Sequence, residues 1–405
     1  MVGTEVAVGA LDESGPRSQS GTCQDGQVRR RVLLQAVLTV AVVGGLTAAV
    51  IPVVAHSDLA TTDIRTAASA PPTLQAAPLP ASLRIKWTVP EEVASGGGAA
   101  AGPTVVSTLG NRLAGIDPAT GRERWSYRRG NARLCSWVAQ DGVVVAAFAK
   151  SNGCRDLIAL DQGTGARKWY RTLEVTSNVT LISASGVIVA VSPTQLIAVD
   201  PGTDLNRWPY SKGGCTFQSP AIGQLATVIL ATCDGQARLL GHDPYAEKER
   251  WNLQAPAGAR YVLAADGAVA VLVGSGSTTA VEFYDGDGKH LGRLADPRLA
   301  PVAGVAPVTR VSGAVLLVWT GSTVVALDTG TRRVRWAAPS DTAAVVDGDQ
   351  VVLTTGTSVV SRAVSSGRVI GTAAVAGTTV PAGAVVARSG AMVVVTSGGR
   401  TTGLG

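Results

Sequence analysis

Residues Leu113–Trp125 read LAGIDPATGRERW: an apolar run ends at Asp117, a Pro and a Thr-Gly pair follow, and a Trp closes the phrase. The phrase returns as LIALDQGTGARKW, LIAVDPGTDLNRW, LLGHDPYAEKERW and VVALDTGTRRVRW, ending at Trp169, Trp208, Trp251 and Trp336. In each copy the Trp follows the Asp by eight residues, as 125 follows 117. Recurrence at fixed internal spacing predicts a repeat architecture. The phrase is therefore interpreted as a marker of structural units, not as a ligand signature.

Two weaker copies extend the series. VEFYDGDGKHLGR carries Arg293 at the Trp position, and VVSRAVSSGRVIG has Ala363 and Gly371 in place of Asp and Trp. The repeat Asp positions are 117, 161, 200, 243, 285 and 328, so the period is 39 to 44 residues. Between phrases lie two short β-rich runs separated by turns, and no amphipathic helical run is found. Four strands in about 40 residues describe a β-propeller blade, which predicts an all-β fold.

The two ends of the repeat region predict how the ring closes. LRIKW, ending at Trp87, reads as a fourth strand without the first three, whereas AGAVVARSG, AMVVVTS and GRTTGL at the C-terminus read as three strands without a fourth. Pairing them completes one blade and removes the exposed edges of an open sheet. The length from residue 83 to 405 predicts eight blades. Seven is the alternative, since the weak units after Trp336 could merge.

The D-x-x-T-G-x-x-x-W pattern resembles the pyrroloquinoline-quinone (PQQ)-dehydrogenase-like β-propeller repeat family. The match is clearest at residues 117–125 and 161–169, and the resemblance extends over nearly everything after residue 84. It implies that Thr-Gly forms the turn between the third and fourth strands of a blade. It also implies that the Trp packs between adjacent blades, which predicts structural seams at Trp87, Trp125, Trp169, Trp208, Trp251 and Trp336.

The N-terminal region predicts a membrane anchor. Residues 32–55, VLLQAVLTVAVVGGLTAAVIPVVA, carry no charge and are long enough to span a bilayer, and Arg29, Arg30 and Arg31 precede them. We therefore expect a disordered cytoplasmic segment at 1–31, a transmembrane anchor at 32–55, an Ala/Pro-rich linker at 56–83 that lifts the domain off the membrane, and an extracytoplasmic propeller at 84–405. The predicted location is the plasma membrane, single-pass. A cleaved signal peptide is the alternative.

Cysteine positions agree with an exported domain. Four of the five cysteines form two local pairs, for which we predict the disulfides Cys135–Cys154 and Cys215–Cys233. If residues 215–222 and 226–233 form a hairpin, the second pair lies directly across it. Four cysteines allow three connectivities, so local pairing is a preference. Cys23 is expected to be free.

Little in the sequence indicates catalysis. Enzymes of the resembling family use a calcium site, a catalytic Asp and commonly a vicinal disulfide, but this chain has no adjacent cysteines. We interpret the repeat Asp residues as turn caps. His56, His242 and His290 lack ligand spacing, which disfavours a zinc site. The net charge of +6 is too dilute over 405 residues for a nucleic-acid reader. We predict no enzyme, no catalytic or metal-binding residues and no cofactor.

Residues that break the repeat are the candidates for a binding face. They are Tyr127, Arg128, Arg129, Arg133, Trp137, Tyr210 and Lys212. Several lie in loops between blades, which the resemblance implies are on the ligand-bearing side. The alternative is a solvated basic loop and core aromatics.

The expected function is that of a scaffold or binding module in cell-envelope biogenesis. The Ala/Gly/Val/Arg bias is typical of a GC-rich bacterium. If the source carries mycolic acids, membrane-tethered propellers of this kind resemble components of trehalose-monomycolate export. The expected partners are then an envelope membrane protein or transporter and a glycolipid. A PQQ-dependent dehydrogenase is the alternative.

Overall fold

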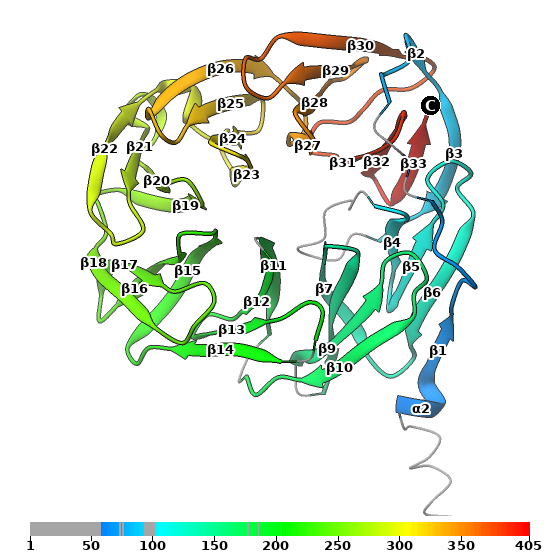
Figure 1. The fold of residues 1–405 in the computed structure, drawn as a ribbon, viewed down its shortest axis with the longest axis horizontal. Helices are drawn as coiled ribbons and strands as arrows, with labels where there is room; N and C mark the ends of the chain where they lie inside the picture. Colours follow the sequence, from blue (N-terminus) through cyan, green and yellow to red (C-terminus); the bar gives the residue numbers. More distant parts are fainter. Residues whose placement is uncertain are drawn as a thin grey trace, which may run out of the picture. The chain divides into compact units, whose positions relative to one another are not determined.

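The computed structural model describes residues 58–72, 74, 77–92, 102–151, 153–175, 178–184, 186–203 and 205–405. Residues 61–405 form one unit in which eight sheets are arranged around a ring (Figure 1). The fold is an eight-bladed β-propeller, and the seven-bladed alternative is wrong. The weak units after Trp336 stay separate because each builds its own sheet, one from β27 to β30 and the other from β31 to β33.

Blades I to IV follow the chain from the first complete phrase. Blade I contains β4 (Val105–Leu109), β5 (Arg112–Ile116) and β6 (Glu123–Arg129), and blade II contains β7 (Arg133–Gln140), β8 (Val143–Lys150), β9 (Gly153–Asp161) and β10 (Arg167–Thr172). Blade III contains β11 (Thr180–Ala184), β12 (Val187–Val191), β13 (Gln195–Val199) and β14 (Asn206–Ser211). Blade IV contains β15 (Cys215–Ile222), β16 (Thr227–Cys233), β17 (Gln236–His242) and β18 (Glu249–Gln254).

Blades V to VIII complete the ring. Blade V contains β19 (Ala259–Ala265), β20 (Val269–Val273), β21 (Ala280–Tyr284) and β22 (His290–Ala295), together with the short 3-10 helices η1 (Gly276–Thr278) and η2 (Pro297–Leu299). Blade VI contains β23 (Val308–Ser312), β24 (Val315–Trp319), β25 (Thr323–Asp328) and β26 (Arg333–Pro339). Blade VII contains β27 (Val345–Asp347), β28 (Gln350–Thr355), β29 (Ser358–Ala363) and β30 (Val369–Val375), and blade VIII contains β31 (Val385–Ser389), β32 (Met392–Ser397) and β33 (Arg400–Leu404).

The ring closes through the N-terminal strand, as predicted. Strand β3 (Ile85–Pro90) pairs antiparallel with β33, so that Trp87 lies opposite Gly403 and Pro90 opposite Arg400. Blade VIII therefore takes its outer strand from one end of the repeat region and its three inner strands from the other. This pairing covers the hydrogen-bonding edge that β33 would otherwise expose.

The Ala/Pro-rich segment expected as a linker is bound to the propeller at several points. Helix α2 (Asp58–Thr61) leads into β1 (Thr62–Arg65), which pairs antiparallel with β6 at the outer edge of blade I. Further on, β2 (Ser82–Leu83) pairs parallel with β30 of blade VII. The backbone groups of β1 and β2 find partners in the sheets, so the segment is attached to the propeller at residues 62–65 and 82–83 and does not act as a free spacer there.

The predicted cytoplasmic segment and transmembrane span, residues 1–55, lie outside the described residues. Within the part of the chain that the structure describes, no helix is long and apolar enough to cross a membrane.

The core lies between blades and follows from strand composition. The middle strands are continuous apolar runs, such as VVVAAFAK in β8 and VAVLV in β20, and their side chains are buried on both faces. A run buried on both faces is expected of a strand covered on each side by another sheet. Each apolar cluster accordingly joins strands of two neighbouring blades, for example β8 and β9 of blade II with β12 and β13 of blade III.

Candidate functional site

The repeat tryptophans lie at the seams between blades. Each indole Nε1–H donates to the carbonyl of the residue that follows the repeat Asp position of the next blade: Trp87 to Pro118 (2.9 Å), Trp125 to Gln162 (2.8 Å), Trp169 to Pro201 (3.1 Å), Trp208 to Pro244 (3.1 Å), Trp251 to Gly286 (2.9 Å) and Trp336 to Val364 (2.8 Å). Six of the eight seams therefore use the same contact. The repeat tryptophans therefore have a structural role: each one joins two neighbouring blades.

Two glycines make room for the ring of Trp125. A Cβ at Gly115, its cross-strand neighbour in blade I, would lie 2.0 Å from the indole Nε1. A Cβ at Gly165, in the Thr-Gly turn of blade II, would lie 2.6 Å from the indole Cγ. Gly165 also has a φ of +70°, which side chains rarely adopt. The Thr-Gly of the repeat phrase thus serves both the turn and the seam.

The repeat Asp side chains cap the turns between third and fourth strands. The Asp161 carboxylate, for instance, accepts from the backbone N–H groups of Gly163 (3.1 Å) and Thr164 (2.9 Å). In several blades the same carboxylate also binds the Arg before the Trp, as in Asp200–Arg207 (2.5 Å). Burial alone would raise the pKa of Asp200, but hydrogen bonds from Gly202, Arg207 and Thr203 hold it below its ordinary value. These acids act as structural caps, in line with the sequence interpretation.

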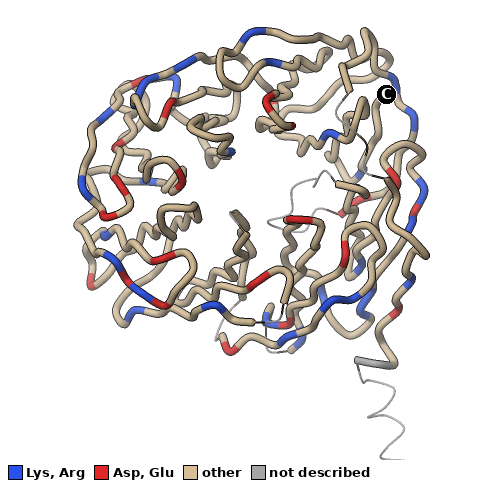
Figure 2. Tube along the Cα trace, viewed as in Figure 1, with Lys and Arg blue, Asp and Glu red and all other residues tan. Residues whose placement is uncertain are grey.

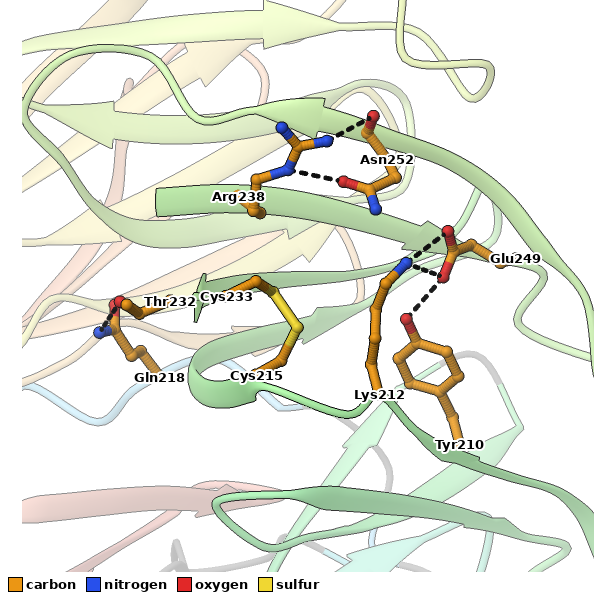
Figure 3. The surroundings of a disulfide bond; sticks show 9 residues. All are labelled: Tyr210, Lys212, Cys215, Gln218, Thr232, Cys233, Arg238, Glu249 and Asn252. Atoms are coloured by element: carbon orange, nitrogen blue, oxygen red, sulfur yellow. Dashed lines mark hydrogen bonds and ion pairs between the residues drawn. A yellow bond between two sulfur atoms is a disulfide. The ribbon is translucent and has the colours of Figure 1, made fainter. Parts of the chain in front are cut away.

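Both predicted disulfides are present. Cys135 in β7 is bonded to Cys154 in β9, and Cys215 is bonded to Cys233 directly across the β15–β16 hairpin. Figure 3 shows the second bond beside the start of β15. The two bonds lie in blades II and IV, which are separated by blade III.

Of the seven predicted binding-face residues, three are buried and four are at least partly exposed. Tyr127 and Trp137 are core side chains, 2% and 3% exposed, in a cluster shared by blades I and II. Arg129, 1% exposed, donates to Asp156 (3.2 Å) and lies over the rings of Phe148 and Tyr170. These three residues are buried because β6 runs on to Arg129 and β7 already begins at Arg133.

The other four predicted residues are at least partly exposed, but they do not form one surface. Arg128 is exposed on β6, opposite Asp63 of β1. Arg133 lines a groove between blades I and II. Tyr210 and Lys212 lie two blades further along, on the seam between blades III and IV.

The groove between blades I and II has a volume of about 740 Å³. Its walls come from the turn between β4 and β5, the loop between β6 and β7, and the turn after β8. The lining residues are Glu92, Gly110, Asn111, Gly130, Asn131, Ala132, Arg133, Leu134, Cys135, Ala149, Lys150 and Ser151. This composition offers amide, hydroxyl, ammonium and guanidinium groups beside one carboxylate, so the groove is suited to a polar partner.

A charged network underlies the groove. The Asp156 carboxylate lies 3.3 Å from Lys150 Nζ and 3.2 Å from Arg129 Nη1, and it accepts from the Thr172 hydroxyl at 2.8 Å. Burial would raise the pKa of Asp156, but the hydrogen bond from Thr172 and the charges of Lys150 and Arg129 lower it. The network keeps the ammonium of Lys150 at the groove and fixes the end of β6 against blade II.

A second polar cluster lies on the seam between blades III and IV, beside the Cys215–Cys233 bond (Figure 3). The Glu249 carboxylate accepts from the Tyr210 hydroxyl (2.7 Å) and from Lys212 Nζ (2.9 Å). Burial and the carboxylate raise the pKa of Tyr210, whereas hydrogen bonds from Tyr210 and Lys212 hold the pKa of Glu249 below its usual range against the effect of burial. Three residues from two segments, the end of β14 and the start of β18, thus join two blades.

Sequence reasoning missed several residues of these clusters. Asp156, Glu249 and Lys150 carry no repeat signature, and only their three-dimensional neighbours reveal their roles. For His242 the sequence does contain a signal: it stands directly before the repeat Asp, at the position that holds the apolar residues Ile116 and Leu160 in other repeats. It is 2% exposed and stacks on Trp208 at 5.2 Å, and burial lowers its pKa.

No metal centre is indicated among the residues that the structure describes: none of their His, Cys, Asp and Glu side chains form a group of three able to hold an ion.

Comparison with known proteins agrees with the class that the blades define, a closed β-propeller. Residues 80–214 match the family model described as "Outer membrane protein assembly factor BamB". A search of curated proteins found no match. The matched region covers blades I to III and the closing strand β3, so the chain is similar to that family over the part where its repeat phrases are clearest.

Three solved structures are similar to this chain at low identity. BamB from Moraxella catarrhalis is 15% identical over 80% of this chain and 99% of that chain, with a TM-score of 0.47. The quinohemoprotein alcohol dehydrogenase ADHIIG from Pseudomonas putida HK5 is 10% identical over 80% and 76%, with a TM-score of 0.46. The C-terminal WD40 domain of Sif2 is 10% identical over 80% and 98%, with a TM-score of 0.51. Of these three, the Sif2 domain has a TM-score above 0.5, and at 10% identity that likeness concerns the fold alone.

Proposed function

We propose that this chain is a non-enzymatic scaffold of the cell envelope, anchored in the plasma membrane by residues 32–55, with its propeller outside the cytoplasm. Its partner class is an envelope membrane protein or transporter, and an exporter of mycolate glycolipids such as trehalose monomycolate is the specific candidate. The observation that carries this proposal is the polar groove between blades I and II, which is built from residues outside the repeat pattern.

Two features support a binding role for this groove. The repeat Asp and Trp side chains are occupied in capping turns and closing seams, so recognition falls to residues between the phrases. In addition, loops that connect rigid blades can present side chains without flexing the ring. Arg133 is exposed at the start of β7, and the Cys135–Cys154 bond holds the adjoining wall.

The test is crosslinking and capture of the full chain from intact membranes of its own host. We expect recovery of a transporter or other envelope protein by the natural chain, and loss of that protein with Arg133→Glu. Lys289→Glu, an exposed cation on blade V, is the matched control and should retain it. Equal recovery by both variants would move the binding site away from the groove, and capture of no envelope protein would contradict the scaffold.

The enzymatic alternative has its own readout. Purified protein would be incubated with pyrroloquinoline quinone and Ca²⁺ and assayed for dye-linked oxidation of alcohols and sugars. We expect no turnover above the quinone alone. Turnover would overturn the proposal.

A further inference from the structure

One position of the repeat differs between blades in a way that concerns surface charge. The residue before the Trp is basic in all six Trp-bearing phrases. In blades III, IV and VI it is an Arg paired with the repeat Asp of its own turn, at 2.5 Å (Asp200–Arg207), 2.6 Å (Asp243–Arg250) and 2.5 Å (Asp328–Arg335). In blade I the same pair, Asp117–Arg124, is 3.9 Å apart. The cation is therefore neutralised locally in these four blades.

Blades II and VIII depart from this pattern. Their basic residues are Lys168 and Lys86, and neither forms an ion pair with any residue that the structure describes. Blade VIII lacks the repeat Asp because its outer strand comes from the other end of the chain. In blade II, Asp161 is occupied with the backbone and the Thr164 hydroxyl. The two unpaired lysines flank blade I on either side.

Two exposed arginines add to this charge. Arg122 lies in the turn of blade I that packs on Trp87, and Arg167 begins β10 beside Lys168. We call Lys86, Arg122, Arg167 and Lys168 the basic rim. All four are exposed. Figure 2 shows basic segments along the outer strands of these blades, with acidic segments among them, and basic segments also lie on the outer strands of other blades. Nearby, Glu123 is paired with Arg112, whereas two exposed acidic groups count against the rim: Glu174 beyond β10, and Asp63 of β1, which lies 3.9 Å from Arg65.

The N-terminal segment is fixed to the same side of the ring. Strand β1 pairs with β6 of blade I from Thr62 onward, and Ala67 N–H donates to Thr164 O in the turn of blade II (2.9 Å). Only residues 56–61 separate the predicted span from β1, a length whose extended reach is at most about 25 Å. The chain thus emerges at blade I, next to the basic rim.

We propose that the basic rim lies against an anionic lipid surface, so that the ring is docked at the membrane by the outer edges of blades VIII, I and II. The orientation rests on the proposed membrane attachment, whereas the lipid affinity rests on the rim alone. Unpaired Lys and Arg near an anionic surface each add favourable electrostatic energy that decays within a Debye length. The paired cations of blades III, IV and VI lack this contribution.

The experiment is hydrogen exchange of the full chain with vesicles of phosphatidylglycerol and phosphatidylcholine, compared with vesicles of phosphatidylcholine alone. We expect slower exchange in peptides that cover β3, β6 and β10 only with the anionic lipid, and loss of that protection in 0.5 M salt. Equal exchange in both lipids, or protection centred on blades IV to VI, would overturn the proposal.

Charge reversal provides the matched comparison. The triple variant Lys86→Glu, Arg167→Glu and Lys168→Glu should lower binding to anionic vesicles at least tenfold, given roughly fivefold per cation. The control triple variant reverses three exposed cations of blades V, VI and VII: Lys289→Glu, Arg333→Glu and Arg368→Glu. It should bind as the natural chain does, and equal losses in the two variants would show only a net-charge effect, which contradicts a localised rim.

Membrane fractionation separates this proposal from the proposed function. If the natural chain is released from membranes by salt, the anchor fails, yet rim protection with added anionic vesicles would still support the lipid contact. If the chain stays in the membrane but the backbone amides of β3, β6 and β10 exchange equally with both lipids, the membrane anchor is supported and the proposal for the basic rim is wrong.

Discussion

Six seams of this propeller carry a repeat Trp and two do not. At each of the two exceptions, a buried leucine from outside the repeat phrase packs between the blades. At the seam between blades V and VI the Trp position holds Arg293, whose guanidinium turns to Glu282 at 2.7 Å. There Leu299 of η2, fully buried, packs in a cluster with Phe283 of blade V and Leu327 of blade VI. The apolar contact is supplied from outside the repeat.

The seam between blades VII and VIII is the second exception. Its Trp position is Gly371, and Leu83 of β2 is fully buried in a cluster with Val375 of blade VII and Val393 of blade VIII. A segment that precedes the propeller in sequence therefore fills this seam. The comparison teaches that a seam needs a buried apolar side chain of sufficient size, and that its source can be the repeat, an insert or the N-terminal segment.

The closing strand should give the largest effect, because it has two roles: it completes the sheet of blade VIII and carries Trp87 to the seam with blade I. We compare a chain that starts at residue 81 with one that starts at residue 91. The second should lose cooperative thermal unfolding, as measured by circular dichroism and calorimetry, since β33 becomes an open edge. Equal melting temperatures would refute closure through β3.

Among single substitutions, Trp125→Ala should be the most damaging at a Trp seam. The side chain is fully buried, and its removal leaves a cavity and takes away one of the two hydrogen bonds that the Gln162 carbonyl accepts, the other coming from the Thr104 hydroxyl. The expected loss is about 3–5 kcal/mol in the free energy of unfolding, measured by urea denaturation. Trp125→Phe, which keeps most of the volume, should recover part of it. A loss below 1 kcal/mol would mean that the seam does not depend on Trp.

Leu299→Ala sharpens the comparison, because it tests whether the insert replaces a Trp. Full burial between two blades predicts a loss of about 2–5 kcal/mol in urea denaturation. Leu205→Ala is the control: that side chain is 63% exposed, so its loss should stay within about 0.5 kcal/mol. If Leu299→Ala behaves like Leu205→Ala, then the seam between blades V and VI is held by other contacts.

Much of the fold could be predicted from the sequence because the repeat phrase encodes it locally. Asp117 and Trp125 recur at a fixed spacing, so one observation applies to five seams, and the incomplete units at the two ends predict closure and the sixth Trp seam, at Trp87. Leu299 and Leu83 could not be predicted in this way, since they lie outside the phrase and ordinary leucines carry no positional signal. Only the three-dimensional arrangement shows which gaps they fill.

The candidate site was predicted less well, for a related reason. Tyr127 and Arg129 follow the phrase, which predicts a loop and hence exposure, whereas for Trp137 the sequence leaves both a binding residue and a core aromatic open. The strands extend further than the phrase, so these side chains are buried between blades I and II. The partner that holds Arg129, Asp156, is 27 residues away in sequence, and no spacing rule connects them.

The smallest expected effect concerns the turns. Asp200→Asn keeps an oxygen to cap the turn but removes the charge that pairs with Arg207, so we expect a loss of about 0.5–1 kcal/mol at pH 7. Because the pKa of Asp200 is lowered by folding, its contribution is present above the ordinary value of 3.8 and disappears as the pH falls through the lowered value. The difference between the natural chain and Asp200→Asn should therefore close on acidification. Urea denaturation at pH 7 and at steps below pH 4 measures this difference, with Lys168→Gln, at the corresponding unpaired position of blade II, expected to show none. A difference that persists unchanged in acid would assign the effect of Asp200 to the shape of the turn and not to its charge.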